Sequence, residues 1–403
     1  MVAPCCHFSH SVATPASLIR NFAPVLKIAI SSTNPCHLYE MAVALTEEGS
    51  CVDYYSGYPA WKLGEFGNDR LRVISKSFRT LVTYGMLRIP ENLRPKDGRL
   101  FEWQDDKFDQ RVAKALRKNG ADVVHAMPGQ SRETFRECRR LGIPAMLNHA
   151  SGPIRTQRAL IEAEYERVGI RTEDAHRFNS RCESREQAEI ALADFHCVAS
   201  SIVKSQLTAE GVDPDRIFIV PYGADPVLFP KRLAAPAGQF RICFAGQLSL
   251  RKGIKTLLDS LEHAGEPDWQ CQFYGRHSSE TAADFGNYRG ATEVGLKGSV
   301  SRMALADAMR ASSVLVLPSW EEAFGLVVPQ ALQSGVPCIV SDRVGAADLI
   351  RHRSNGSVFP AGDSEALLEE LRFWESRPSI VTGDYTWQQP ARLLQSITEG
   401  VLA

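Results

Sequence analysis

The chain has 403 residues, of which 44% are hydrophobic and 23% charged, a balance typical of globular proteins rather than disordered or fibrous ones. Its 46 basic and 47 acidic side chains give a formal charge of −1, so no nucleic-acid partner is predicted. No run reaches the ~18 consecutive apolar residues of a membrane-spanning helix. At roughly 150 residues per domain, the length predicts two domains.

The ten cysteines include no Cys-x-x-Cys pair, and several lie inside apolar runs. This usage favours small core residues in a reducing compartment over disulfides or a metal site, so we predict a cytoplasmic location and no metal. Residues 1–24 carry one basic side chain, Arg20, and lack a clean apolar stretch. A secretory signal is therefore not predicted.

Short apolar runs alternate with amphipathic helical patterns along almost the whole chain. Predicted strands form two series, 25–31, 122–127, 144–149, 195–200 and 217–221, then 240–246, 269–275, 313–319, 337–342 and 357–360. Predicted helices between them include 37–48, 109–118, 254–263, 302–310 and 364–374. Continuous apolar strands separated by helices indicate parallel sheets covered on both faces. The predicted fold class is therefore α/β, with two doubly wound, Rossmann-like domains facing across a cleft.

Prolines mark the boundary between the two series. Pro221, Pro226, Pro230 and Pro236 fall close together, and their fixed φ angles and missing amide donors disfavour regular structure. We therefore predict a first domain over 25–221, a second over 222–385 and a C-terminal helix over 386–403, with the linker near 222–239.

The first informative turn follows the strand that opens the second series. Gly246 allows a sharp turn, and Arg251, Lys252 and Gly253 precede the next helix. Free amides and the positive end of a helix favour an anion such as a phosphate or diphosphate, and the two side chains add full charges. The alternative is a solvated basic loop.

A longer motif covers 314–342, where a strand ends at Ser319 and a loop with Glu322 and Gly325 leads into a short helix. Glu322 and, in the first helical turn, Gln330 are predicted to face the space above the strand ends. A carboxylate there accepts hydrogen bonds from hydroxyls, and the backbone of Phe324, Gly325 and Leu326 can donate to oxygen atoms. Glu321 is predicted to be a solvated neighbour.

Together these motifs resemble the family 4 retaining glycosyltransferases, which have the GT-B fold. The resemblance rests on 246–253 and 322–330, which match the family's Gly-Arg-x4-Lys-Gly turn and Glu-x7-Glu motif, and on 220–225, 273–275, 296–300, 345–350 and 355–360. It covers about 190–403 closely and 120–190 more loosely. It implies transfer of a sugar from a nucleotide-diphosphate sugar to a hydroxyl acceptor with retained configuration, as in polysaccharide biosynthesis, with the donor as substrate and no cofactor. It also implies that the last helix crosses back to the first domain.

The resemblance assigns roles residue by residue. Lys252 is expected to neutralise the β-phosphate, Glu322 to hold hydroxyls of the transferred sugar, and position 330 to bind the ribose. The amides of Phe324, Gly325 and Leu326 are expected to contact the sugar and diphosphate. Two positions depart from the family pattern, because Gln247 replaces an arginine and Gln330 a glutamate. Arg251 lies close enough in sequence to reach the same oxygens, although from a different position.

The first domain is expected to hold the acceptor. His149 is taken as a candidate catalytic residue beside Lys252 and Glu322. It ends a predicted strand, at a position where the family often has a histidine near the transferred sugar, and His125 is a weaker candidate. Ser31 to Pro35 follow the first strand without the glycines that relatives often have there. Residues 69–100 carry eight basic and three acidic side chains interleaved with apolar ones. This pattern is typical either of a surface helix or of a segment resting on anionic lipid beside a lipid-linked acceptor, at the inner face of a membrane.

Two alternatives to transfer stay open. A GT-B epimerase or phosphorylase would process the sugar nucleotide without an acceptor alcohol. A degenerate nucleotide-binding partner of another transferase is suggested by Gln247 and Gln330.

Overall fold

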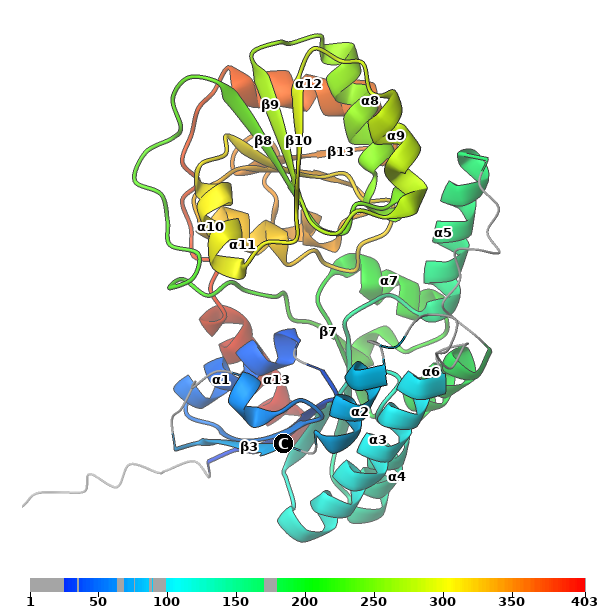
Figure 1. Ribbon diagram of the computed structural model, residues 1–403. Coiled ribbons are helices and arrows are strands. Elements are labelled where there is room, and N and C mark those ends of the chain that lie inside the picture. Colours follow the sequence, from blue (N-terminus) through cyan, green and yellow to red (C-terminus); the bar gives the residue numbers. More distant parts are fainter. Residues whose placement is uncertain are drawn as a thin grey trace, which may run out of the picture.

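The computed structural model describes residues 25–34, 36–63, 69–75, 77–86, 89, 99–169 and 180–402. They form two α/β lobes, each built on a parallel sheet (Figure 1). GT-B is the name of this two-domain arrangement.

The first sheet has seven parallel strands in the order β3-β2-β1-β4-β5-β6-β7. Its strands are β1 Lys27–Ser32, β2 Cys51–Ser56, β3 Leu71–Ser75, β4 Val123–Ala126, β5 Ala145–His149, β6 Phe195–Val198 and β7 Ile217–Ile219. The helices of this domain are α1 His37–Glu47, α2 Phe78–Met86, α3 Arg99–Asn119, α4 Arg132–Leu141, α5 Ile154–Arg167, α6 Ser180–Leu192 and α7 Ser201–Ala209.

Alternate side chains of these strands enter two separate cores. Ile28 and Ile30 of β1 pack with α1 on one face, whereas Ala29 packs with Phe108 of α3 and Phe135 of α4 on the other. This period-two division is what a parallel sheet covered on both faces requires.

The second sheet has six parallel strands in the order β10-β9-β8-β11-β12-β13. Its strands are β8 Phe240–Ala245, β9 Trp269–Tyr274, β10 Glu293–Gly298, β11 Val314–Leu317, β12 Cys338–Ser341 and β13 Gly356–Phe359. Its helices are α8 Ile254–Ala264, α9 Ala282–Asn287, α10 Arg302–Arg310, α11 Val327–Gln333 and α12 Ser364–Glu375. Its inner residues join one large apolar cluster.

The chain crosses between the domains twice, at neighbouring points. Ala224 forms a parallel bridge with Thr386, and its amide donates to the carbonyl of Tyr385 at 2.8 Å. Helix α13, Gln388–Leu402, then packs beside α1 of the first domain (Figure 1). Gln388 and Arg392 bond Glu47 and Glu48 at 3.0 and 2.9 Å.

Several elements differ from the sequence-based expectation. Strands β2, β3 and β10 were not predicted, because β2 contains Asp53, β3 contains Arg72 and β10 is an exposed edge strand. Residues 71–75, expected within one amphipathic segment, form an edge strand in which Arg72 bonds Asp53 of β2. Helix α3 is twice as long as its predicted core, 109–118.

Candidate active site

The carboxyl ends of β8 and β11 carry the two segments singled out in the sequence. Because these strands are neighbours at the switch point of the second sheet, the turn over 246–253 and the loop over 318–326 lie side by side. Gly253 has a φ of +68°, and a Cβ there would lie 1.9 Å from the carbonyl oxygen of Pro318. Only glycine permits this approach, which brings the residue before it, Lys252, against the loop.

Lys252 and Glu322 meet at this contact. Their ammonium and carboxylate form an ion pair, and their side chains keep only 11% and 17% of their exposure. The pKa of Lys252 is lowered to about 7, mainly by burial and also by the nearby charge of Arg251, while Glu321 opposes the shift. The touching carboxylate of Glu322 also favours the charged ammonium. The structure thus brings together the two side chains on which the donor site was predicted to depend.

The loop that carries Glu322 is held by backbone hydrogen bonds to the segment that follows β12. The amide of Glu322 donates to the carbonyl of Arg343 at 3.2 Å, and the amides of Gly345 and Ala346 donate to the carbonyls of Glu322 and Phe324 at 2.9 and 2.8 Å. Phe324, Gly325 and Leu326 lead directly into α11, and the first amides of a helix have no partner within it. The backbone amides of Phe324, Gly325 and Leu326 therefore lie where they can donate to the oxygen atoms of a ligand.

Arg251 and Glu321 form a second pair next to the first. Nη1 of Arg251 donates to the carbonyl and Oε2 of Glu321 at 3.0 and 2.8 Å, and Nε2 of Gln157 donates to the same Oε2 at 3.1 Å. Glu321 is only 4% exposed, so the expectation of a solvated neighbour was wrong. The carboxylate is buried because α5 of the first domain covers it. Arg251 is engaged by Glu321, whereas Gln247, on the same turn, is exposed.

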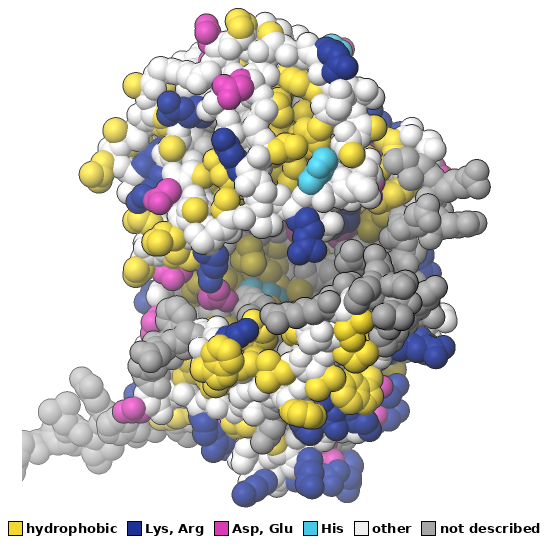
Figure 2. Space-filling view, viewed as in Figure 1, with side chains coloured by type: hydrophobic (Ala, Val, Ile, Leu, Met, Phe, Trp, Pro, Cys, Tyr) yellow, Lys and Arg dark blue, Asp and Glu magenta, His cyan; other side chains and the backbone are white. Residues whose placement is uncertain are grey.

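A cavity of about 330 Å³ opens between the domains, within the size range of small-molecule sites. Leu326 and Gln330 line it from the second domain, and Cys36, His37, Tyr39 and Glu40 line it from the start of α1. Arg302 and Glu40 form an ion pair between the domains at its wall, with 3.2 Å between Nη1 and Oε1. Figure 2 shows the molecular surface hollowed between the two lobes.

His149 lies at the end of β5, buried to 1% exposure. Its Nε2 is 3.1 Å from Nδ1 of His196 on β6, and its carbonyl accepts a 3.4 Å hydrogen bond from Tyr222. Burial lowers the pKa of His149 to about 3, with His196 adding to the shift. The ring therefore engages a neighbour in its own sheet and is neutral at physiological pH. His125 is likewise buried, 3.4 Å from the amide nitrogen of Asn148.

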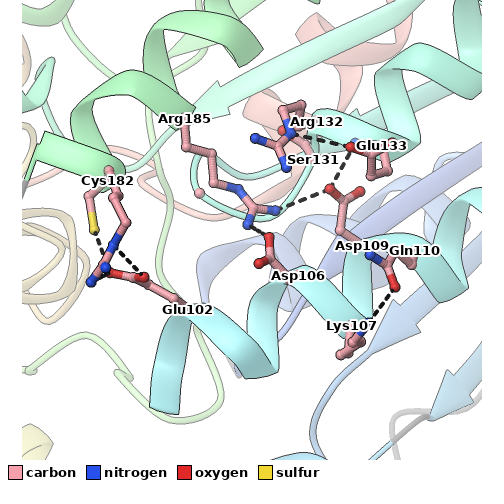
Figure 3. Close-up of polar contacts among 12 residues, drawn as sticks. Glu102, Asp106, Lys107, Asp109, Gln110, Ser131, Arg132, Glu133, Cys182 and Arg185 are labelled. Atoms are coloured by element: carbon pink, nitrogen blue, oxygen red, sulfur yellow. Dashed lines mark hydrogen bonds and ion pairs between the residues drawn. The ribbon is translucent and has the colours of Figure 1, made fainter. Parts of the chain in front are cut away.

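A charged network supports the strand ends of the first domain, and Figure 3 shows Arg185 of α6 reaching between Asp106 and Asp109 of α3. Glu189 accepts hydrogen bonds from the amides of Ser131 and Arg132 at 2.9 and 3.1 Å, where α4 begins. Sequence reasoning missed this network, because α6 was not predicted and its partners lie about 80 residues away on α3. The i,i+4 spacing of Arg185 and Glu189 was its one local signal.

The loop after β1 lies beside this network. The amide of Thr33 donates to Gln130 at 2.5 Å, and Asn34 accepts from the hydroxyl of Tyr84 at 3.2 Å. Pro35 lies outside the described residues. Burial raises the pKa of Asp105 to about 7, although a hydrogen bond with Thr33 opposes the shift. Within the described ranges, no three His, Cys, Asp or Glu side chains are grouped so as to hold a metal ion.

Residues 228–382 match a family model described as "Glycosyl transferases group 1". Over 180 residues the chain is 30% identical to a D-inositol 3-phosphate glycosyltransferase of Xylanimonas cellulosilytica, which covers 40% of this chain and 43% of the relative. It is 26% identical over 215 residues to a lipopolysaccharide 1,6-galactosyltransferase of Salmonella typhimurium, which covers 49% and 55%. The chain thus matches about half the length of these curated relatives.

Solved structures agree over nearly the whole chain. A sucrose-phosphate synthase from Thermosynechococcus elongatus superposes with a TM-score of 0.66 and 19% identity, covering 93% of this chain and 99% of that one. HepE of Anabaena, solved with UDP-glucose, gives 0.61 and 14%, again covering 93% and 99%. At these identities the likeness shows the fold, which is GT-B as expected.

Proposed function

Starting from a GT-B chain whose residues 228–382 belong to the glycosyl transferases group 1 family, we propose that this protein is a retaining glycosyltransferase using a nucleotide-diphosphate sugar. The bond between the anomeric carbon and the diphosphate oxygen breaks, and an acceptor hydroxyl oxygen bonds that carbon from the same side. The hydroxyl proton passes to the leaving diphosphate. The observation that carries the proposal is the Lys252–Glu322 pair at the switch point of the second sheet.

The two side chains have separate tasks in this reaction. Lys252 stabilises the charge that gathers on the leaving diphosphate, because a preorganised cation in a water-poor site acts strongly on developing charge. Glu322 accepts hydrogen bonds from hydroxyls of the transferred sugar. Since the two pair with each other here, the bound donor exchanges that contact for its own phosphate and hydroxyl groups. Gln330, which lines the interdomain cavity, accepts from the ribose.

Donor binding tests the proposal first. Thermal shifts with UDP-, GDP- and ADP-sugars identify the base, because a ligand that binds only the folded state raises its stability. Transfer is then measured with the preferred donor, and the anomeric configuration of the product is read by NMR. Glu322→Gln should reduce transfer; a variant with wild-type rates would remove Glu322 from the site. Product formed from donor and inorganic phosphate alone would instead indicate a phosphorylase or epimerase.

Helix α2 exposes apolar side chains and buries polar ones, which is the reverse of an ordinary surface helix. Thr80 and Thr83 are buried, whereas Phe78, Leu81 and Tyr84 are 71%, 49% and 42% exposed. Other exposed aromatic side chains near this helix are Trp61, Phe101 and Trp103. Figure 2 shows hydrophobic side chains gathered on this part of the first domain.

Cations accompany these aromatic rings. Arg79 lies 5.3 Å from the ring centre of Trp103, and Lys62 lies 5.0 Å from that of Trp61. Aromatic rings mixed with basic side chains suit the interface of an anionic membrane. We therefore propose that α2 and its neighbours rest on such a surface and present a lipid-linked acceptor. Four of the basic residues counted in 69–100, Lys76, Arg88, Arg94 and Lys96, lie outside the described residues.

Vesicle binding tests this part of the proposal. We expect co-sedimentation with vesicles containing anionic lipid but weak binding to neutral ones. Phe78→Glu with Leu81→Glu should abolish it, whereas Val227→Glu, at an 88% exposed linker position, should not. Equal binding by both variants would contradict the α2 surface.

The described helices include none that is long and apolar enough to span a membrane.

A further inference from the structure

Two partly buried contacts connect one helix of the first domain to the donor turn of the second. The donor turn is residues 246–253. Glu321 bonds Arg251 of this turn and also accepts from Gln157 of α5. Glu280 accepts from the amide of Leu250 at 3.3 Å, and its other oxygen pairs with the hydroxyl of Tyr165 on α5. Each carboxylate is thus shared between the donor turn and α5.

These contacts flank Lys252 closely. Leu250 and Arg251 are the two residues before it, and each is held by one of the shared carboxylates. The guanidinium of Arg167, also on α5, lies 4.9 Å from the ring centre of Trp320, whose amide donates to the carbonyl of Arg251 at 2.9 Å. Figure 1 shows α5 extending from the first lobe alongside the second. One helix therefore reaches the donor turn at several points.

Other contacts between the domains avoid the donor turn. Ser201 bonds Asp348 through its amide at 2.7 Å and its hydroxyl at 2.6 Å, and Ser200 donates to the carbonyl of Ala323 at 2.7 Å. Glu40 and Arg302 pair at the cavity wall. These contacts hold the domains together, but they bond residues outside 246–253. They therefore allow a test that separates domain contact in general from contact with the turn.

We propose that Gln157 and Tyr165 of α5 are positioning residues, which set the geometry of Lys252 through Glu321 and Glu280 when the domains are in contact. The proposal rests on the proposed transfer function and adds a coupling between the two domains. When α5 withdraws, each carboxylate loses one hydrogen-bond donor. The loss costs more at Glu321, which is only 4% exposed, than at the partly exposed Glu280. The donor turn is then held less firmly. The side chain of Lys252 is therefore held in its position only while α5 of the first domain is in contact with Glu321 and Glu280.

The test uses the double variant Gln157→Ala/Tyr165→Phe, which leaves both carboxylates and the donor turn unchanged in sequence. We expect hydrogen exchange of the amides over 250–253 to rise roughly tenfold, because two hydrogen bonds of ordinary strength are lost. The turnover number should fall by a similar roughly tenfold factor, while the KM for the donor stays within about threefold. Glu321→Gln should change exchange and turnover in the same direction.

The matched control is Ser201→Ala, which removes a hydrogen bond between the domains away from the donor turn. It should leave exchange over 250–253 unchanged and turnover within about threefold. An equal loss of turnover in the control and the double variant would overturn the positioning role, and so would unchanged exchange in the double variant. The exchange readout needs no substrate. The two proposals can therefore fail separately. If the wild type transfers no sugar but exchange over 250–253 rises in the double variant and not in Ser201→Ala, the proposed function is refuted and the coupling is supported.

Discussion

The two domains form opposite walls of one cleft. They differ in how many ionisable side chains they bury. The second domain places its loops over a large apolar cluster, and its buried ionisable side chains outside the cysteines and tyrosines are Arg232, Glu321 and Glu370 among the residues described. The first domain buries many more behind its strands: His37, His125, His149, His196, Asp53, Asp109, Glu137, Glu164, Glu186 and Glu189. The loops of the second domain thus lie over an apolar core, whereas interacting charges support the strand ends of the first domain.

This contrast predicts different sensitivities. A turn whose shape depends on glycine should respond sharply to an added methyl group. A domain with neutral, buried histidines should respond to acid. The following variants test the contrast, beginning with the largest expected effect.

Lys252→Ala should have the largest effect on function. Under the proposed function this removes the cation that stabilises the leaving group, which should lower kcat/KM by about a hundredfold or more, as with loss of one oxyanion donor. Steady-state transfer kinetics measure this. Lys255→Ala is the matched control, because Lys255 pairs with Asp259 within α8 and is 40% exposed. An unchanged rate in Lys252→Ala would discard the phosphate role, and equal losses in both variants would point to a change in the fold.

Gly253→Ala should have the largest effect on the stability of the second domain. Its Cβ would overlap the carbonyl of Pro318, and φ is +68°, so we expect a loss of roughly 2–5 kcal/mol. Gly265 has a nearly identical φ of +64°, but a Cβ added there would meet no other group within 4 Å. Gly265→Ala should therefore cost only ~1–2 kcal/mol. Urea-dependent hydrogen exchange of β8 and β11 separates the two, and equal losses would contradict the close approach.

His149→Gln should have the smallest effect on stability, confined to acid. The pKa of His149 is about 3 in the folded protein and about 6.5 when unfolded, so its neutral state costs nothing above pH 6.5. As the pH falls below 6.5, the unfolded chain binds a proton that the folded chain excludes, and stability is lost. By pH 5 the loss is ~2 kcal/mol.

Carboxyls with raised pKa values act in the opposite direction, because the folded protein binds their protons first as the pH falls. Asp105 and Glu186, with pKa values of about 7, belong to this group. Comparing wild type with His149→Gln at pH 7.5 and 5.0, by urea unfolding, isolates the histidine. The wild type should lose ~2 kcal/mol more than the variant between these pH values. His263→Gln, at an exposed position on α8, should behave as wild type.

The same contrast explains how much could be predicted from the sequence. Glycines and prolines mark the donor turn and the loop after β11 locally, so Lys252 and Glu322 could be placed on neighbouring strand ends before their contact was known. The burial of Glu321 could not, because it depends on Gln157, which is 164 residues away and belongs to the other domain. The missed strands β2 and β3 carry polar residues that pair only across the sheet, as Arg72 does with Asp53.

In the first domain, tertiary contacts determine the positions of more side chains than local sequence patterns do. Arg185 of α6 pairs with Asp106 and Asp109 of α3, about 80 residues away, and His149 lies against His196 because of the register of β5 and β6. Such placements follow from pairing between distant segments, which periodicity does not encode. The fold class could therefore be predicted from the sequence, whereas the side-chain contacts at the strand ends of the first domain could not.

The paired crossing at Ala224 and Thr386 makes the second domain an insertion within the first, because α13 returns to pack on α1. The insertion leaves and re-enters at adjacent points, so it can be exchanged as a cassette without redesigning the connections. Under the proposed function, a chimera spliced at these two positions would combine the nucleotide preference of one parent with the acceptor surface of the other. Its weakest point would be α5, which has to recognise a foreign donor turn.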